Sequence, residues 1–570
     1  MSIINFRKLN NIEYIILEFE DDSEKLAYDF KYIFDEKIKI TDIIKFDSNS
    51  FSINEKNQAL ICCTYDKNEA KKKLEKKKLL YQRDYLFADD YFCILDDWNG
   101  KKIAYKTYKF DLIKWRKTLT YGYAAKHGKV LWNDRYREIL KGRYINNKGN
   151  KYSKHLVQNK VTLGRCLEYA LYLLLGLIDF LPQIGAKKRH YDKYDYICFY
   201  EILDAIKFKK DFPELSSKVI TTEELKNHTM ASLYMKAVYY DRRQNDCGCK
   251  VPLETIWIGD KGTTRLCGCP DYLDISCGNM GITDNDEIWN STLAKIMRLS
   301  VINNTYTFCS RELCREFNGN PDGDKLLERK EADFTREYPN IIKVANDYVC
   351  NLHCPSCRKM IHAKNDDNEE LEIVTCIDSL MESGWLDKAN NVVVGASGES
   401  FLSPSYRKII FDGVAHRNSI DIMTNGTLFT PQIWEKMEGK YKHVTFSVSI
   451  DAATKETYEK VRCGGNWDKL MENMAFLSKL RKENKVESVM VNMIVQKKNY
   501  REIPDFIRWA KEMEFDSVYL SHIWNWGTFS ADEFENEVSM FDKDGKMKTE
   551  LAKVLEDPIC KDPIVDMRWE

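Results

Sequence analysis

The sequence predicts an α/β protein: a partial barrel of six βα units at the C-terminal end, preceded by a cysteine-rich module and a small N-terminal α/β domain. From residue 339 onward, six short apolar runs alternate with amphipathic stretches of helical period. Repeated βα units imply a parallel sheet with right-handed crossovers, whose active site lies at the carboxyl ends of the strands. The cysteines concentrate at 247–314 and 350–357, as metal ligands do.

Residues 1–100 predict the small α/β domain, which we interpret as Rossmann-like. Strand-like runs occupy 14–19, 38–44 and 59–64, and a helix with a lysine-rich, solvated face is expected at 66–78. The first strand is not followed by G-x-G-x-x-G, so the sequence gives no support for dinucleotide binding.

Residues 101–228 predict a mostly helical region of unknown role. Helices are expected around 163–181 and 223–239, and no catalytic motif accompanies them. Residues 229–314 form the cysteine-rich module, and residues 315–338, with Gly, Asn and Pro followed by charged residues, are interpreted as a linker.

Residues 339–570 form the expected barrel domain. Its strands are predicted, in chain order, at 341–349, 391–396, 419–424, 444–450, 488–495 and 516–522. Amphipathic helices are predicted between them, including 367–384, 466–483 and 502–513.

The composition excludes several classes of protein. Hydrophobic content of 44% with 31% charged residues is typical of a globular chain, and a net charge of −1 disfavours a dedicated nucleic-acid or membrane-surface binder. The ten uncharged residues 169–178 are too few to span a bilayer. The first residues lack the apolar stretch of a signal peptide, so we expect a cytoplasmic protein in which the 18 cysteines are not paired as disulfides.

The strongest motif is the C-x3-C-x2-C triplet formed by Cys350, Cys354 and Cys357, directly after an apolar run. Three thiolates within eight residues can hold three corners of an iron–sulfur cube and leave the fourth iron open to a substrate or cofactor. A zinc site completed by a distant ligand is the alternative.

Polar motifs recur at the ends of successive predicted strands. Ser397, Gly398 and Glu399 follow the second strand, where small residues let the backbone approach a ligand and a carboxylate can accept hydrogen bonds from an ammonium. Asn425, after the third strand, suits a sugar hydroxyl. The remaining ends carry Ser449 and Asp451, then Arg462, and finally residues 522–527.

Together these motifs make residues 339–527 resemble the core of the radical S-adenosylmethionine (SAM) superfamily. The resemblance implies a [4Fe–4S] cluster held by Cys350, Cys354 and Cys357, with SAM chelating the open iron. It also implies roles in SAM binding for six further positions: Glu399 at the amino group with Ser397 and Gly398 before it, Arg462 at the carboxylate, Ser449 at the ribose and methionine, and, more weakly, Asn425. Ser356 stands where the family usually has an aromatic residue, which leaves adenine packing unassigned.

The cysteine-rich module resembles the SPASM/twitch module of peptide-modifying radical SAM enzymes. Cys249 is followed by Gly262 and Cys267, and Cys309 by Cys314, at the spacing of that family. The resemblance implies one auxiliary cluster held by Cys249, Cys267, Cys309 and Cys314. Three further cysteines are alternates, namely Cys247, Cys269 and Cys277, and a structural zinc remains the other interpretation. The module precedes the barrel here, whereas in most relatives it follows it.

The sequence therefore predicts an enzyme that cleaves SAM reductively to a 5′-deoxyadenosyl radical, which takes a hydrogen atom from a C–H bond of a peptide or protein side chain. A flavodoxin- or ferredoxin-type protein is the expected electron donor, and no general base is needed for this step. Oxidation of an alcohol on a sugar-like small molecule is a second possibility, and a non-enzymatic iron–sulfur or zinc scaffold a third.

Overall fold

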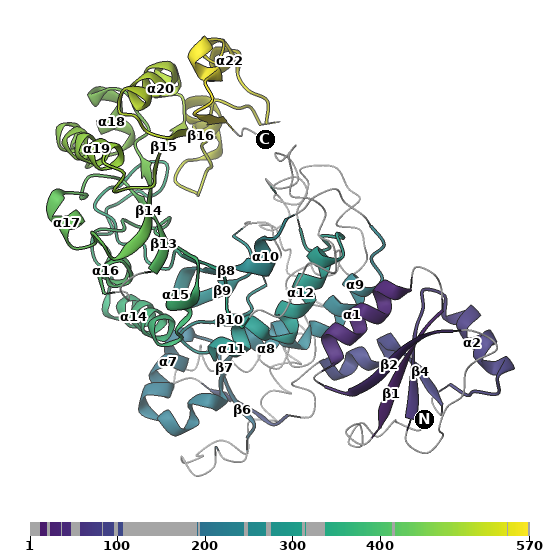
Figure 1. Ribbon diagram of the computed structural model, residues 1–570. Coiled ribbons are helices and arrows are strands. Elements are labelled where there is room, and N and C mark those ends of the chain that lie inside the picture. The colour runs from purple at the N-terminus through teal and green to yellow at the C-terminus, as the bar shows by residue number, and fades with distance from the viewer. Residues whose placement is uncertain are drawn as a thin grey trace. The chain divides into compact units, whose positions relative to one another are not determined.

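The chain divides into two compact units in the computed structural model (Figure 1). The N-terminal unit comprises residues 1–253, 269–277 and 286–336, and the sheet unit comprises 254–268, 278–285 and 337–570. The structure describes residues 12–19, 23–35, 37–46, 58–81, 84–95, 101–106, 191, 194–243, 249–268, 275–309, 314, 337–412, 417–543 and 545–567. The helix expected around 163–181 and most of the expected linker at 315–338 lie outside these residues.

The N-terminal unit contains two parallel sheets. The four-stranded sheet has the order β2-β1-β3-β4, with β1 at Glu13–Glu18, β2 at Lys39–Lys45, β3 at Gln58–Cys63 and β4 at Tyr85–Phe87. The three-stranded sheet has the order β5-β6-β7, with β5 at Ile103–Lys106, β6 at Tyr196–Phe199 and β7 at Val219–Thr221. The strands predicted near 14, 38 and 59 are therefore present.

The helices of the N-terminal unit are α1 Glu24–Phe34, α2 Lys67–Lys76, α7 Ile202–Asp211, α8 Thr222–Thr229, α9 Ala231–Tyr239, α10 Val251–Glu254, α11 Asn285–Asn290 and α12 Thr292–Ile302, of which α10 and α11 lie at the borders of the unit. They differ in burial, from α2, which buries two residues, to α12, which is buried almost all round. In α2 the Asp66 carboxylate caps the helix, and only Ala70 and Leu74 are buried, so its lysines form the solvated face that the sequence predicts. The single helix predicted at 223–239 is divided into α8 and α9.

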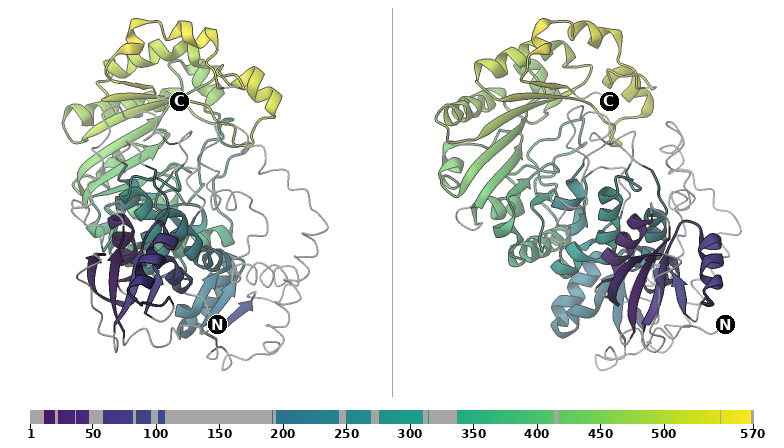
Figure 2. Two further views of the ribbon diagram at one scale, coloured as in Figure 1. Left: turned by 90° about the vertical axis from the view of Figure 1, so that its right-hand side faces the viewer. Right: turned by 45° about the vertical axis from the view of Figure 1, so that its right-hand side comes forward.

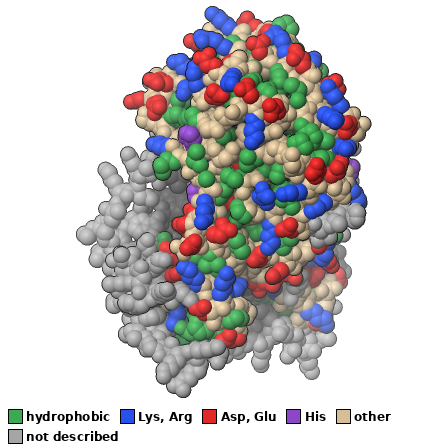
Figure 3. Space-filling view, turned by 90° about the vertical axis from the view of Figure 1, so that its left-hand side faces the viewer, with side chains coloured by type: hydrophobic (Ala, Val, Ile, Leu, Met, Phe, Trp, Pro, Cys, Tyr) green, Lys and Arg blue, Asp and Glu red, His purple; other side chains and the backbone are tan. Residues whose placement is uncertain are grey.

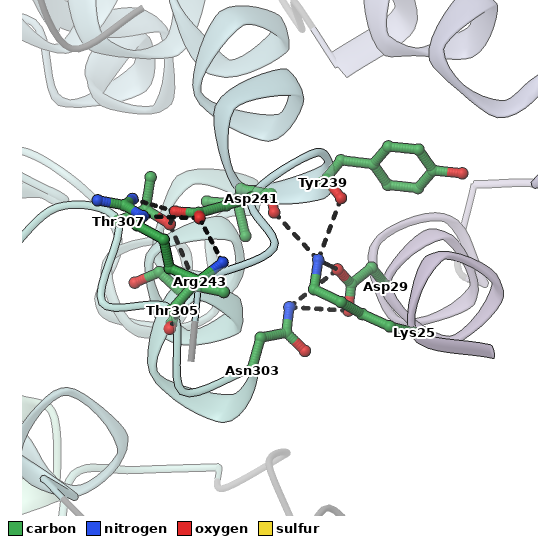
Figure 4. Close-up of polar contacts among 10 residues, drawn as sticks. Lys25, Asp29, Tyr239, Asp241, Arg243, Asn303, Thr305 and Thr307 are labelled. Carbon is green, nitrogen blue, oxygen red and sulfur yellow. Dashed lines mark hydrogen bonds and ion pairs between the residues drawn. The ribbon is translucent and has the colours of Figure 1, made fainter. Parts of the chain in front are cut away.

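A buried polar network ties α1 to α9 and to the end of α12 (Figure 4). The Lys25 ammonium donates to the Asp29 carboxylate at 3.0 Å and to the carbonyl oxygens of Val238 and Tyr239, both at 3.1 Å. The Asn303 amide donates to the same carboxylate at 2.9 Å. Because Asp29 is fully buried, these donors compensate a charge that would otherwise be costly to bury.

The sheet unit contains one ten-stranded sheet, in the order β10-β9-β8-β11-β12-β13-β14-β15-β16-β17. Its strands are β8 Thr255–Ile258, β9 Thr263–Arg265, β10 Gly278–Asn279, β11 Ile341–Val344, β12 Asn391–Val394, β13 Arg417–Thr424, β14 Tyr441–Ser449, β15 Ser488–Val495, β16 Ser517–His522 and β17 Val565–Met567. All neighbouring pairs from β8–β11 to β16–β17 are parallel, and β8, β9 and β10 pair antiparallel.

Helices connect the parallel strands along one side of this sheet, as Figures 1 and 2 show. They are α14 Asp367–Glu382, α15 Trp385–Lys388, α16 Pro404–Phe411, α17 Pro431–Glu435, α18 Lys455–Val461, α19 Trp467–Lys482, α20 Ile503–Glu512, α21 Ala531–Glu533 and α22 Thr549–Val554. The core lies between the sheet and these helices: Val489 and Val491 of β15 are fully buried, as are Phe506 and Ile507 of α20. On the helical side, positive and negative side chains are interspersed (Figure 3).

The sheet differs from the prediction in three places. One is β17, which pairs parallel with β16 and is not among the six predicted strands. The strand expected at 341–349 ends at Val344. The chain leaves the sheet there because Asp347 is buried, where its carboxylate accepts hydrogen bonds from Ser403 and Ser405. Residues 254–268 and 278–285, expected within the cysteine-rich module, contribute β8, β9 and β10 to the larger sheet. Within the described part of the chain, no helix has both the length and the apolar character needed to cross a bilayer.

Candidate functional site

The cysteine triplet occupies a loop beyond the carboxyl end of β11. The Cys350 backbone N–H donates to the His362 carbonyl at 2.8 Å, and the Cys357 N–H donates to the Cys354 carbonyl at 2.9 Å. Cys354 is buried, Cys350 is half-buried and Cys357 is exposed. The loop therefore presents its three thiols at different depths on one edge of the sheet.

Asp347 holds the chain between β11 and Cys350 in place, a role that the sequence did not predict. Its carboxylate accepts from the Ser405 hydroxyl at 2.9 Å, the Val349 backbone N–H at 3.0 Å and the Asn365 amide at 3.2 Å. The Tyr406 hydroxyl also donates to its carbonyl at 2.9 Å. The chain therefore enters the cysteine loop from a fixed position.

Glu399 lies at the end of β12, fully buried, with its carboxylate engaged by three donors. These are the Thr424 hydroxyl at 2.6 Å, the Asn425 backbone N–H at 2.7 Å and the Phe401 backbone N–H at 3.2 Å. Burial raises the pKa of Glu399, and the three donors oppose that rise. A carboxylate can accept about four hydrogen bonds, so one acceptor position is left for a ligand such as an ammonium.

The two small residues before Glu399 lie against the cysteine loop. A Cβ atom at Gly398 would be 2.6 Å from the Val349 carbonyl oxygen and 2.7 Å from that of Asp347, so only glycine fits. The Ser397 hydroxyl donates to the Ala345 carbonyl at 3.0 Å. Gly398 thus allows a close approach to the chain just before the cysteines, while the predicted approach of this backbone to a ligand stays a prediction.

Asn425 holds the loop after β13. Its Nδ2 donates to the Asn351 side-chain oxygen at 2.9 Å, and its Oδ1 accepts from the Thr427 hydroxyl at 2.6 Å. Nδ2 also lies 3.9 Å from Cys350 Sγ. Asn425 thus links the end of β13 to the cysteine loop, while its role toward a sugar hydroxyl stays a prediction.

Arg462 follows α18 and is buried beside Cys354. Its Nη2 forms an ion pair with the Asp451 carboxylate at 2.8 Å, and its Nη1 donates to Cys354 Sγ at 3.7 Å. Burial raises the pKa of the Cys354 thiol, and the guanidinium opposes that rise. The Arg462 Nε is buried without a hydrogen-bond partner among the described residues. An unpaired buried donor of this kind fits the carboxylate of a bound ligand.

Ser449 ends β14 and is half-buried, in register with Asn492 of β15. The structure therefore brings Cys350, Glu399 and Asn425 together through direct contacts and places Arg462 against Cys354 of the same loop. Ser449 lies at the same edge of the sheet. Their roles toward SAM remain predictions.

The donor set fits an iron–sulfur cube. Within the described ranges, no three His, Cys, Asp or Glu side chains are grouped around the position of a single metal ion. A cube binds each thiolate through a different iron, so its three cysteines do not converge on one point.

The cysteine-rich segments are divided between the two units. Cys249 and Cys309 belong to the N-terminal unit, and both pack against the buried pair Val301 and Tyr306. Cys267 follows β9 in the sheet unit. Cys314 is half-buried, and Cys247 and Cys269 lie outside the described residues. Cys277 is fully buried, which raises its pKa to about 12 and disfavours it as a thiolate ligand.

Asp241, which follows α9, is hydrogen-bonded to the segment that leads to Cys309 (Figure 4). Its carboxylate accepts from the Thr307 hydroxyl at 2.9 Å and from Arg243 Nε at 2.7 Å. No sequence motif points to this carboxylate, because its partner Thr307 is 66 residues away along the chain.

Comparison with known proteins finds a family model that matches part of the sheet unit. Residues 348–510 match the model of the Radical SAM superfamily, which uses a [4Fe–4S] cluster and SAM, and this match indicates an enzyme. The AdoMet-dependent heme synthase of Methanosarcina barkeri is 30% identical over 166 residues, which are 29% of this chain and 45% of that protein.

Two further similarities are weaker. The tungsten-containing aldehyde ferredoxin oxidoreductase cofactor-modifying protein of Pyrococcus furiosus is 24% identical over 179 residues, 30% of this chain and 49% of that protein. The chain thus spans about half the length of these curated relatives. The crystal structure of Streptococcus suis SuiB matches 40% of this chain and 49% of its own at 15% identity, with a TM-score of 0.28.

Proposed function

We propose that this chain is a radical SAM enzyme that abstracts a hydrogen atom from a C–H bond of a peptide or protein side chain. The observation that carries the proposal is the contact of the cysteine loop with Glu399 and Arg462. The segment after β12 supplies a buried carboxylate with a spare acceptor position, and the end of α18 supplies a guanidinium whose buried Nε is a spare donor. Their opposite charges match the ammonium and carboxylate of an amino acid such as the methionine of SAM.

In this proposal Cys350, Cys354 and Cys357 hold the [4Fe–4S] cluster. The bound cluster supplies one electron for the reductive cleavage of SAM to a 5′-deoxyadenosyl radical. Glu399 accepts the SAM ammonium and Arg462 donates to its carboxylate, so that the two charges fix the orientation of the methionine portion. Gly398 allows the backbone to lie against the cysteine loop, and Ser449 lines the ribose and methionine. Holding the reacting atoms in one geometry is the main contribution of the protein.

A peptide substrate and an auxiliary cluster are supported by the SPASM-like pattern of Cys249, Gly262, Cys267, Cys309 and Cys314. In the N-terminal unit, Cys249 and Cys309 pack against the same buried pair, which favours a shared site. A flavodoxin- or ferredoxin-type donor would supply the electron.

A small-molecule substrate is the second candidate. It is favoured by the names of the two curated relatives, a heme synthase and a cofactor-modifying protein. Their similarity covers less than a third of this chain, so the names bear on the SAM-cleaving part more than on the substrate.

Isotope transfer tests the substrate class. The full chain, reconstituted anaerobically with iron and sulfide, would be incubated with SAM, dithionite and a library of deuterated peptides containing all twenty residues. Transfer of deuterium to 5′-deoxyadenosine, together with a mass change in a peptide, supports the peptide proposal. Unlabelled 5′-deoxyadenosine and unchanged peptides would contradict it while leaving SAM cleavage intact.

A further inference from the structure

Arg358, the residue after the third cysteine, makes an unusual set of contacts. Its guanidinium donates to Cys357 Sγ from Nε at 3.4 Å and from Nη2 at 3.5 Å. It also donates from Nη1 to the Tyr348 carbonyl at 2.6 Å and from Nη2 to the Ser397 carbonyl at 2.8 Å. One planar fork therefore fixes the third cysteine to the chain before the loop and to the segment that precedes Glu399.

Each cysteine of the triplet has its own donor. Cys350 Sγ accepts from the Leu352 backbone N–H at 3.5 Å, and Cys354 Sγ accepts from Arg462 at 3.7 Å. The charge of Arg462 is paired with Asp451. Arg358, in contrast, forms no ion pair with a carboxylate among the residues that the structure describes. Its positive charge therefore acts on the Cys357 sulfur without a competing anion.

A positive charge and N–H donors at a cluster thiolate favour the reduced cluster. Reduction adds one electron, and thus one negative charge, to the cluster and its sulfurs. Donors to those sulfurs stabilise that charge more in the reduced form than in the oxidised form, which raises the reduction potential. The effect is greatest where no carboxylate neutralises the donor.

We propose that Arg358 is a positioning residue that sets the reduction potential of the SAM-binding cluster and ties Cys357 to the SAM-binding segment at Ser397. This inference rests on the proposed function, because it requires a cluster on Cys350, Cys354 and Cys357. It concerns a residue to which neither the sequence motifs nor the family resemblance assigns a role.

The test is a redox titration of the full, reconstituted chain, followed by electron paramagnetic resonance with dithionite and mediators. The signal of the SAM-binding cluster is identified as the one that changes when SAM is added. Arg358→Gln removes the charge, and Arg358→Lys keeps the charge but not the fork. Arg407→Gln is the matched control, since Arg407 is a half-buried arginine of the same unit that donates to a backbone carbonyl, that of Phe401, at 3.0 Å.

We expect Arg358→Gln to shift the equilibrium of the cluster toward its oxidised form by about tenfold, the scale of one charge-assisted hydrogen bond, which lowers a one-electron midpoint potential by about 59 mV. The midpoint potential of Arg358→Lys should lie between those of Arg358→Gln and the wild type, and that of Arg407→Gln should equal the wild-type value. A wild-type potential in Arg358→Gln would overturn the inference. If Arg358→Gln does not hold iron, a wild-type midpoint potential in Arg358→Lys would overturn the inference in the same way. A wild-type chain that binds no cluster on the triplet would instead contradict the proposed function.

Discussion

Replacing Arg462 by methionine separates its two expected roles. The guanidinium pairs at 2.8 Å with Asp451, which is fully buried. Removing one partner of a buried ion pair leaves the other charge uncompensated, so we expect Arg462→Met to lower the free energy of unfolding by about 3–5 kcal/mol. The Ile494 backbone N–H still donates to Asp451 at 2.7 Å and places the loss at the lower end of this range.

The same substitution should weaken SAM binding. If Arg462 Nε donates to the SAM carboxylate, the lost charge-assisted hydrogen bond is worth roughly 1.5–3 kcal/mol, or about ten- to a hundredfold in affinity. The double variant Arg462→Met/Asp451→Asn removes both buried charges, so we expect most of the stability to return. SAM binding should stay weak in the double variant, because the donor is still missing. Asp451→Asn alone keeps the donor and should bind SAM at least as tightly as the wild type.

Urea unfolding gives the stability of the four proteins, and calorimetry of the reconstituted chain gives their affinity for SAM. Wild-type SAM affinity in the double variant would refute the assignment of Arg462 to SAM and leave it only as the partner of Asp451. Unchanged stability in the single variant would refute the reasoning on the buried pair.

Three further predictions follow from the contacts described. Gly398→Ala should displace the cysteine loop, because its Cβ would lie 2.6 Å from a carbonyl oxygen. We expect this variant to lose about 1–3 kcal/mol of unfolding free energy and to bind less iron. Gly259→Ala, whose Cβ would meet nothing closer than 3.5 Å, is the control. Partial burial raises the pKa of Asp516, but hydrogen bonds from Arg481 and the Val489 N–H outweigh this effect and lower the pKa below 3.8. The ionised carboxylate therefore stabilises the fold above pH 3.8, and this stabilisation is lost as the pH falls through the lowered pKa. Asp516→Asn should therefore cost about 1–2 kcal/mol in urea unfolding at neutral pH and progressively less under acid, whereas an equal loss at all pH values would contradict the pairing. In the Cys350→Ala/Cys354→Ala/Cys357→Ala variant, about four irons per chain should remain on the auxiliary site. Adding Cys249→Ala and Cys309→Ala should remove this iron, whereas adding Cys560→Ala, the control, should leave the iron content unchanged. About one zinc per chain without sulfide would show a structural metal instead.

Much of the larger sheet is predictable from local periodicity. Alternation in β15 places Val489, Val491, Met493 and Val495 on one buried face, which is the pattern of a half-buried strand. The pairing of β8 with β11 is not predictable in this way, since it joins Thr255 to Ile341 across a long stretch of chain and the run is only four residues long. The structure likewise ends β11 early for a tertiary reason, the burial of Asp347 against Ser403 and Ser405.

In the candidate site, too, local sequence patterns predict some residues and contacts between distant segments determine the others. Cys350, Cys354, Cys357 and Glu399 are visible as motifs because spacing and strand ends identify them. The residues that hold them are set by contacts between distant segments: the Asp347 carboxylate meets Ser405 58 residues away, and Arg358 meets Ser397 39 residues away. Such contacts leave no periodic signal in one sequence.

The production of 5′-deoxyadenosine shows whether the cysteine triplet is needed for SAM cleavage. The wild-type chain and the Cys350→Ala/Cys354→Ala/Cys357→Ala variant would be reconstituted anaerobically and given SAM and dithionite, and the nucleoside would be measured by mass spectrometry. We expect 5′-deoxyadenosine from the wild type and none above background from the variant. Equal amounts from both proteins, or none from a wild type that holds its cluster, would contradict this expectation.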